Sequence, residues 1–136
     1  MARATLINIF STLRAATGLS LFETAAYLNV SQKNVERWVD GDREPPEGVI
    51  KEMSELVALQ TKVVERQLSF MKANSVKQAE IGYPVDDEEA KSMGWPCVSA
   101  FKTVLGRIIA GSDATITLVP RGSTSGTAAA IEAREK

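Results

Sequence analysis

Four hydrogen-bonding side chains lie close together between residues 31 and 41, in the segment "SQKNVERWVDG". Gln32 and Asn34 carry amides that can bond the edge of an adenine base through two atoms, and Lys33 and Arg37 carry cations that can bond guanine or phosphate. On a helix, Gln32, Lys33 and Asn34 would fill the first turn, and Arg37 would follow Lys33 after one more turn. The segment therefore combines the side chains that a nucleic-acid-reading helix needs.

The same segment also carries an apolar face. Val35 and Trp38 are three residues apart, so they would share one side of the helix, and Val30 precedes them on the chain. Ser31 is placed to cap the start of this helix, and Gly41 is placed to end it. Two interpretations follow. It is either an ordinary amphipathic helix with a solvated polar face, or a helix that presents its first turn to a ligand.

Cations and acids are mixed around this helix. The cations are Lys33, Arg37 and Arg43, and the acids are Glu36, Asp40, Asp42 and Glu44. The whole chain has a formal net charge of −1, whereas a nucleic-acid binder is expected to show a basic footprint. Binding to nucleic acid would therefore depend on where charges and hydrogen-bonding groups are placed, and not on the total charge.

The composition limits the classes of function. The chain has 136 residues, a length that suits either one domain or one small domain with an appendage. Of these residues 44% are hydrophobic and 24% charged, which are ordinary values for a globular protein. It contains no histidine and a single cysteine, Cys97, which removes the commonest general base and excludes zinc-finger spacing. We therefore expect no catalytic site, no metal and no cofactor. The lone cysteine, the lack of a long apolar run and the lack of a secretory signal indicate a cytoplasmic chain that does not enter a membrane.

Capping residues mark the elements that must position the polar segment. Gly18 supplies the positive φ that ends a first helix, and Ser20 with Glu23 has the pattern of a capping box. Asn29 can adopt the left-handed conformation that a tight turn needs. Apolar spacing then predicts three short helices, over residues 5–16, 21–28 and 32–39.

A long fourth helix is predicted over residues 47–72, directly after Pro45-Pro46. It carries two stripes of residues, the first comprising Val49, Met53, Leu56, Gln60, Val63, Gln67 and Phe70, and the second Ile50, Val57, Val64, Leu68 and Met71. Either one stripe packs on the chain's own domain and the other on a partner, or both belong to one wide core face.

The remaining chain alternates short elements. "AEIGYPV" predicts a strand that ends at Pro84, and "ATITLV" predicts a half-buried strand. Between them, "DDEEAKSM" predicts a short helix whose acids favour its N-terminal end, and a further amphipathic helix ends at Gly111. Cys97 is expected to be a packed apolar residue. The tail over 121–136 is predicted to be disordered in its first half.

The stretch "LRAATGLSLFETAAYLNVSQKNVERWVDGDREPP" resembles the lambda-repressor/Cro-like, Xre-type family of bacterial and phage transcription regulators. The matching positions are Leu13, Arg14, Gly18, Leu19, Ser20, Ala25, Val30, Ser31, Val35, Trp38, Gly41 and Pro45-Pro46. The resemblance covers roughly the first 55 to 60 residues. Each matching position alone is a weak signal for the family, but together they are specific for it. It implies a compact helical bundle with a helix-turn-helix that binds operator DNA as a dimer.

Carried over by position, the resemblance assigns base reading to Gln32, Lys33 and Asn34, and it includes the capping Ser31 in the DNA-binding set. Arg37 would bond a base or a phosphate, and Arg43 would lie near the DNA backbone.

The chain departs from the family at the start of the second helix. Members often have Gln there, in contact with a phosphate, whereas this chain has Leu21 and Phe22. Either the backbone N–H groups of that helix end bind the phosphate, or Leu21 or Phe22 packs on the C-terminal section.

The second half resembles, more loosely, longer regulators of this family that add a small α/β dimerisation section, among them repressors encoded beside anti-CRISPR genes. We therefore expect a mainly α chain with a helix-turn-helix domain over 1–60, a linking helix and α/β dimerisation section over 61–120, and a tail over 121–136. The residues assigned to dimerisation are Val63, Val64, Phe70, Ile116 and Leu118.

The function expected from these features is that of a sequence-specific, autoregulatory repressor. It would bind an inverted repeat in the major groove of double-stranded DNA as a homodimer. The alternative is a protein-interaction module, such as an antitoxin that holds a partner protein, with DNA binding as a secondary activity. An enzyme is disfavoured because the chain lacks histidine and any paired catalytic set.

Overall fold

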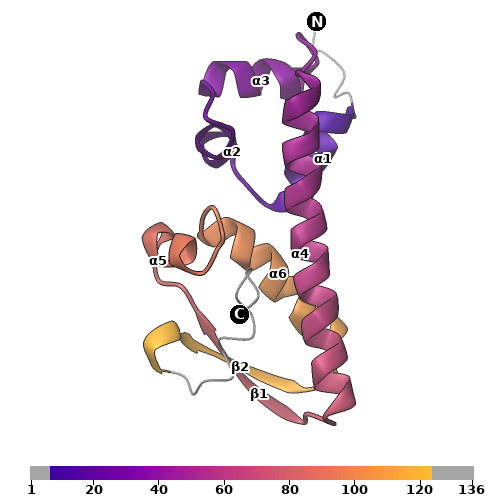
Figure 1. The fold of residues 1–136 in the computed structure, drawn as a ribbon, viewed down its shortest axis with the longest axis vertical. Coiled ribbons are helices and arrows are strands. Elements are labelled where there is room, and N and C mark those ends of the chain that lie inside the picture. The colour runs from indigo at the N-terminus through magenta and orange to yellow at the C-terminus, as the bar shows by residue number, and fades with distance from the viewer. Residues whose placement is uncertain (1–6, 124–136) are drawn as a thin grey trace, which may run out of the picture. The chain divides into compact units, whose positions relative to one another are not determined.

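The structure is a computed structural model that describes residues 7–123. Its elements are α1 (Ile9–Thr17), α2 (Leu21–Leu28), α3 (Gln32–Asp40), α4 (Glu47–Ala73), β1 (Gln78–Tyr83), α5 (Asp87–Ser92), α6 (Val98–Gly111), β2 (Thr115–Pro120) and η1 (Arg121–Ser123) (Figure 1). The described chain is mainly helical with one small sheet, which confirms the expected mainly α class. It divides into two compact units, residues 1–58 and 59–136.

The first unit contains α1, α2, α3 and the first part of α4. Its core consists of Phe10, Ala25, Leu28, Val35, Trp38, Val49 and Met53. Within this core the rings of Phe10 and Trp38 meet edge to face, with their centroids 5.5 Å apart. The core therefore joins α1 directly to α3.

The predicted helix ends of the first unit are confirmed. Gly18 and Gly41 take positive φ angles of 80° and 82° at the ends of α1 and α3. Ser20 and Glu23 form the reciprocal capping box of α2, and Asn29 is left-handed with φ 57°. The local sequence therefore determined where these helices stop, because each end needs a residue that tolerates the turn.

The start of α1 differs from the prediction. The expected helix began at Thr5, which lies outside the described residues, whereas α1 begins only after Asn8. The Asn8 Oδ1 accepts a hydrogen bond from the Ser11 N–H at 2.8 Å, and the Ser11 Oγ accepts one from the Asn8 N–H at 3.3 Å. This capping box begins the helix at Ile9, because an N-cap residue has extended backbone angles.

Asn8 also reaches α3. Its Nδ2 donates to the carbonyl oxygen of Val39 at 3.0 Å and to that of Trp38 at 3.4 Å. The last carbonyls of a helix have no partner within the helix. One side chain thus caps the first turn of α1 and satisfies the last turn of α3.

The chain itself covers most of the first stripe on α4, whereas in the second stripe Val64 and Met71 are buried and Ile50, Val57 and Leu68 are half-buried. The buried members are Val49, Met53, Leu56, Gln60, Val63, Val64, Gln67 and Met71. The Gln60 Nε2 donates to the Ala100 carbonyl oxygen at 3.1 Å, so a polar residue of the first stripe is used inside the second unit. Phe70 is the exception, because 52% of its surface is exposed.

The second unit contains the rest of α4 and the elements from β1 to η1. β1 and β2 pair in parallel, with Ile81 opposite Leu118 and Ala79 opposite Ile116. Parallel neighbours need a long crossover connection, which α5 and α6 supply (Figure 1). The rings of Trp95 and Phe101 meet edge to face in the buried interior, with centroids 6.4 Å apart.

Two further predictions concern the end of the chain and its cysteine. Cys97 is buried, as expected for a packed apolar residue. Residues 121–123 form the short helix η1, which corrects the expectation that the tail is disordered from Arg121 onward. The rest of the predicted disordered stretch begins at residue 124 and lies outside the described residues.

Tyr27 of α2 lies half-buried against α4. Burial raises the pKa of its phenol above the ordinary value of 10.0, and the carboxylates of Glu52 and Glu55 raise it further. Both causes disfavour the phenolate, since it would be poorly solvated and close to like charges.

We predict that Asn8→Ala and Asn8→Asp both destabilise the chain, by about 2 kcal/mol and 1 kcal/mol respectively. The alanine removes the cap and both bonds to α3. The aspartate keeps the cap, but it places a carboxylate oxygen against the Trp38 and Val39 carbonyls at the negative end of α3. Urea unfolding of the three proteins at neutral pH measures this. Asn and Asp are equivalent at a simple N-cap, so wild-type stability for Asn8→Asp would disprove the tie to α3.

We also predict that Tyr27 titrates above pH 10 in the folded chain. The chain has two tyrosines, so the tyrosinate absorbance of a Tyr83→Phe variant reports on Tyr27 alone. Replacing Glu52 and Glu55 by Gln in that background should lower the midpoint. Because the folded pKa is raised, the stability contributed by Tyr27 is present below about pH 10 and is lost as the pH rises through the folded pKa. A midpoint at or below 10 in the folded protein would contradict this assignment.

Candidate nucleic-acid interface

The connection between α2 and α3 consists of Asn29, Val30 and Ser31. The N–H of Val30 returns to the Ala25 carbonyl oxygen at 3.0 Å, which closes the end of α2. The Ser31 Oγ accepts a hydrogen bond from the Asn34 N–H at 3.1 Å and so begins α3. Val30 packs half-buried against the core of the first unit. Each residue of this connection therefore has a local role in placing the start of α3.

The two faces of α3 are separated as the sequence pattern predicted. Val35 is completely buried, and only 5% of the Trp38 surface is exposed. Gln32 and Lys33 are exposed, while Asn34 and Arg37 are half-buried. Because the two apolar side chains are held in the core, the helix cannot turn its polar first turn away from solvent.

The structure brings only some of the candidate residues together. Ser31, Gln32, Lys33 and Asn34 share the first turn of α3, and Arg37 follows one turn later. Arg43 lies beyond the far end of the helix, where its N–H donates to the Arg37 carbonyl oxygen at 3.3 Å. Since a helix rises about 1.5 Å per residue, the nine residues of α3 separate its two ends by roughly 13 Å. Arg43 is therefore not part of the first-turn cluster.

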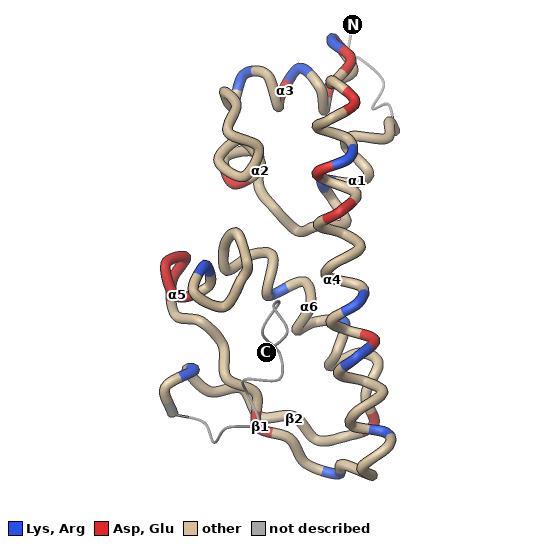
Figure 2. The backbone as a smooth tube through the Cα atoms, in the orientation of Figure 1, with Lys and Arg blue, Asp and Glu red and all other residues tan. Residues whose placement is uncertain are grey.

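The electrostatics of α3 favour an anion at its start. No acidic side chain occupies the first turn, and Lys33 lies there. The N-terminal end of a helix carries partial positive charge and free N–H groups. The acids Glu36 and Asp40 lie further along the helix, and Figure 2 shows acidic and basic positions close together in this region.

The start of α2 is a poorer place for a phosphate. The Glu23 carboxylate accepts a hydrogen bond from the Ser20 N–H at 2.9 Å, and the Ser20 Oγ accepts one from the Glu23 N–H at 3.1 Å. These bonds occupy two backbone donors and place a negative charge at the same helix end. This argues against the expectation that the N–H groups of α2 bind a phosphate. Leu21 packs against the core of its own unit, and 71% of the Phe22 surface is exposed.

Asn8 is the residue that the sequence analysis missed. It holds the C-terminal end of α3 through two carbonyls, and its amide nitrogen lies 3.9 Å from the position that a Cβ on Gly41 would take. Asn8 followed by Ser11 is a capping-box spacing, so the local role was visible in the sequence. The contact with α3 spans about 30 residues and has no local signature.

The residues assigned to dimerisation divide by exposure. Val63 and Val64 are buried within the chain, so the surface that could meet a second copy does not include them. Both side chains are instead covered by other parts of the same chain. Phe70 and Leu118 are 52% and 42% exposed, and Ile116 is half-buried.

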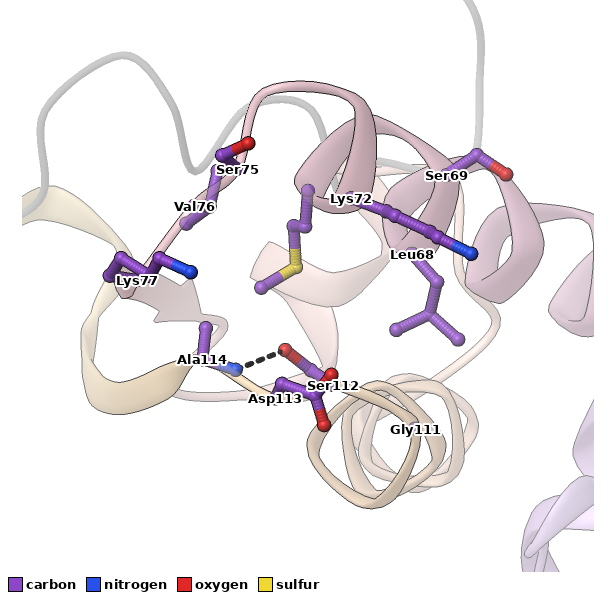
Figure 3. Close-up of a pocket in the computed structure, with 11 residues that line it drawn as sticks. Leu68, Ser69, Lys72, Ser75, Val76, Lys77, Gly111, Ser112, Asp113 and Ala114 are labelled. Carbon is purple, nitrogen blue, oxygen red and sulfur yellow. Dashed lines mark hydrogen bonds between the residues drawn. The ribbon is translucent and has the colours of Figure 1, made fainter.

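A cavity of about 460 Å³ lies in the second unit, beside the C-terminal ends of α4 and α6 (Figure 3). Lys72, Lys77 and Asp113 are among its lining residues, and the Ser112 Oγ accepts a hydrogen bond from the Ala114 N–H at 3.0 Å. Two helices end here with partial negative charge, and Asp113 adds a carboxylate. These offset the two lysines, so the cavity lacks the positive potential of an anion site.

The acid run Asp86–Glu89 has structural partners, as the sequence pattern predicted for helix-start acids. Asp86 accepts a hydrogen bond from the Glu89 N–H, Glu89 from the Val85 N–H and Asp87 from the Val98 N–H, at 2.8 to 2.9 Å. These carboxylates begin α5 and connect it to α6. Within residues 7–123 no group of three or more His, Cys, Asp or Glu could hold a metal ion.

The described residues contain no helix that is both long and apolar enough to cross a membrane. Comparison of the chain with models of known protein families and with curated protein sequences finds no match. A proposal for function must therefore rest on the geometry of α2 and α3 and on the side chains that α3 exposes.

Proposed function

We propose that this chain is a sequence-specific DNA-binding repressor that acts as a homodimer through a lambda-repressor-like helix-turn-helix. The observation that carries the proposal is the division of α3 into two faces. Val35 and Trp38 are held in the core, and the Ser31-capped first turn carries Gln32 and Lys33 in solvent. In this motif α2 crosses the DNA backbone and α3 is the recognition helix, which lies in the major groove.

The chemistry of the first turn fits base edges. The side-chain amide of Gln32 or Asn34 can donate an N–H to N7 of adenine while its carbonyl oxygen accepts from the adenine N6 amino group, so each can read adenine through two hydrogen bonds. Lys33 and Arg37 bond guanine or phosphate oxygens. Only the N-terminal residues of a recognition helix reach base edges, and all four residues lie within the first six positions of α3.

The charge distribution supports binding through placed contacts. The chain has a formal net charge of −1, so it lacks the bulk positive field of many DNA binders. Its α3 nevertheless begins without an acid in the first turn, and that end of the helix attracts a phosphate. Arg43, beyond the other end of α3, would neutralise a phosphate on the flank of the site. Specific hydrogen bonds would then contribute more to affinity than counterion release does.

Dimerisation follows from the geometry of operator DNA. One recognition helix reads only a few base pairs, whereas two helices in successive major grooves read an inverted repeat with half-sites about 34 Å apart. A repressor of this type commonly binds the DNA of its own promoter, so the DNA upstream of its own gene is the natural first ligand. No cofactor is required by this mechanism.

A mobility shift with DNA from the chain's own promoter tests the proposal. We expect a sequence-dependent complex whose affinity falls by no more than about a thousandfold between 50 and 200 mM salt, because Lys33, Arg37 and Arg43 supply few phosphate contacts. An unrelated DNA of the same length and base composition is the control. Equal affinity for both DNAs at both salt concentrations would refute sequence-specific binding.

Gln32→Ala and Asn34→Ala should each weaken operator binding by about 1–3 kcal/mol, and only at particular base pairs of the half-site. Binding to single-base-pair variants of the operator measures this. Ser54→Ala, which changes an exposed polar residue on α4, is the matched control and should leave binding unchanged. A uniform loss of affinity over all operator variants would mean that these amides contact the DNA backbone or merely support the fold.

A further inference from the structure

The sheet of the second unit has an unusual open edge. Within residues 7–123 it consists of two parallel strands only, β1 and β2. Parallel sheets are generally covered, and a two-stranded sheet is marginal by itself. Ile81 and Gly82 of β1 are buried, whereas no residue of β2 is fully buried and Leu118 is 42% exposed. β2 therefore forms the less covered side of the sheet.

The hydrogen-bonding direction of β2 follows from one bond. The Thr115 N–H donates to the Lys77 carbonyl oxygen at 2.9 Å, so the backbone groups of Thr115 point toward the β1 side. These groups alternate in direction along a strand. Those of Thr117 and Val119 thus also point toward β1, and those of Ile116 and Leu118 point out of the open edge.

The two ends of this edge offer no donor. The Ala114 N–H is already bonded to the Ser112 Oγ at 3.0 Å. Pro120 has no N–H, and proline is tolerated where the strand edge faces outward. Ile116 and Leu118 are therefore the two positions of β2 at which both an N–H and a carbonyl oxygen point outward and can pair with another strand.

The charges of the two strands distinguish their edges. β1 carries Glu80 near its middle and follows Lys77, whereas β2, "TITLVP", carries no charge. Edge strands that must stay unpaired are commonly blunted by charged side chains. In an antiparallel pair around a two-fold axis, residues near the axis face their own copies, so Glu80 would face a like charge while β2 would not. β2 is the strand that can pair with itself.

We propose that the open edge of β2 binds β2 of a second copy in antiparallel orientation, so that the two sheets join into one four-stranded sheet. Thr117 lies on the two-fold axis, and Ile116 of each copy pairs with Leu118 of the other. This is the symmetric register that uses both backbone groups of both residues. The inference deepens the proposed function, because it specifies how the homodimer assumed there is held together.

The side chains of this register are also complementary. Ile81 and Leu118 are register partners in the parallel pair, as are Ala79 and Ile116. Residues opposite one another across a ladder share a face of the sheet. In the dimer, one apolar row would therefore cross all four strands. It would consist of Ile81 and Leu118 of one copy followed by Ile116 and Ala79 of the other. The half-covered surface of Leu118 would gain a neighbour, and the two Thr117 side chains would meet on the polar face.

Engineered cysteines test the register. In Thr117→Cys the two Cα atoms would form a non-hydrogen-bonded pair about 4.5 Å apart, within the range that a disulfide spans. The matched control is Thr115→Cys, another exposed threonine on the same face of β2, whose two copies would lie roughly 13 Å apart. Under mild oxidation we expect Thr117→Cys to form a covalent dimer and Thr115→Cys to remain uncrosslinked. Cys97 is present in both variants and in the wild-type blank, and it is buried.

A second pair of variants tests dimer association without forming a covalent crosslink. Thr117→Lys places two like charges at the axis and should raise the dimer dissociation constant by about tenfold or more, whereas Thr115→Lys should change it little. Sedimentation equilibrium measures both, with circular dichroism to verify that each variant is folded. The proposed pairing would be overturned if Thr117→Cys did not crosslink, or if the two cysteine variants crosslinked equally. It would also be overturned if folded Thr117→Lys associated like the wild-type chain, or if the wild-type chain were monomeric.

The outcomes also separate this inference from the proposed function. If the wild-type chain binds its inverted repeat as a dimer but Thr117→Cys does not crosslink, the β2 pairing is wrong and the repressor proposal stands. If Thr117→Cys crosslinks selectively but no sequence-dependent DNA binding occurs, the pairing stands and the repressor proposal is wrong.

Discussion

The packing of Val35 and Trp38 in the core is the constraint on which the first unit depends. Trp38 meets Phe10 of α1 edge to face, and Val35 is completely buried. A helix of nine residues held at two core positions has no freedom to rotate about its axis. The exposure of Gln32 and Lys33 is therefore a consequence of the apolar contacts on the opposite side. Asn8 adds a polar restraint at the other end of α3, where its amide bonds the Trp38 and Val39 carbonyl oxygens.

The attraction of this unit for an anion also depends on the local placement of charges. The net charge gives no general attraction to a polyanion, yet the two neighbouring helix ends differ strongly. α2 begins with Glu23 in a reciprocal capping box, while α3 begins with Lys33 and no acid. A phosphate or base edge would thus be favoured at α3 and disfavoured at α2. Under the proposed function, this contrast would align the motif on DNA mainly through α3, with less help from α2 than the family resemblance implies.

The second unit poses a different physical problem, which is an incomplete sheet. Ile81 and the Trp95–Phe101 pair are buried, but β2 is partly uncovered. An uncharged strand with two outward hydrogen-bonding positions is poorly suited to remain a bare edge. The proposed pairing with a second copy would satisfy these backbone groups and extend the apolar row. It would also supply the two-fold symmetry that an inverted-repeat operator requires.

The sequence by itself determined the features that depend on neighbours along the chain. Helix ends at Gly18, Asn29 and Gly41, the cap at Ser31 and the two faces of α3 all follow from backbone preferences and helical periodicity. Only the tertiary structure decided what depends on distant residues. The tie from Asn8 to the end of α3 and the burial of Val63 and Val64 belong to this group. Periodicity shows that a helix has an apolar face, but it does not show which distant element covers that face, because contacts between distant segments leave no local pattern.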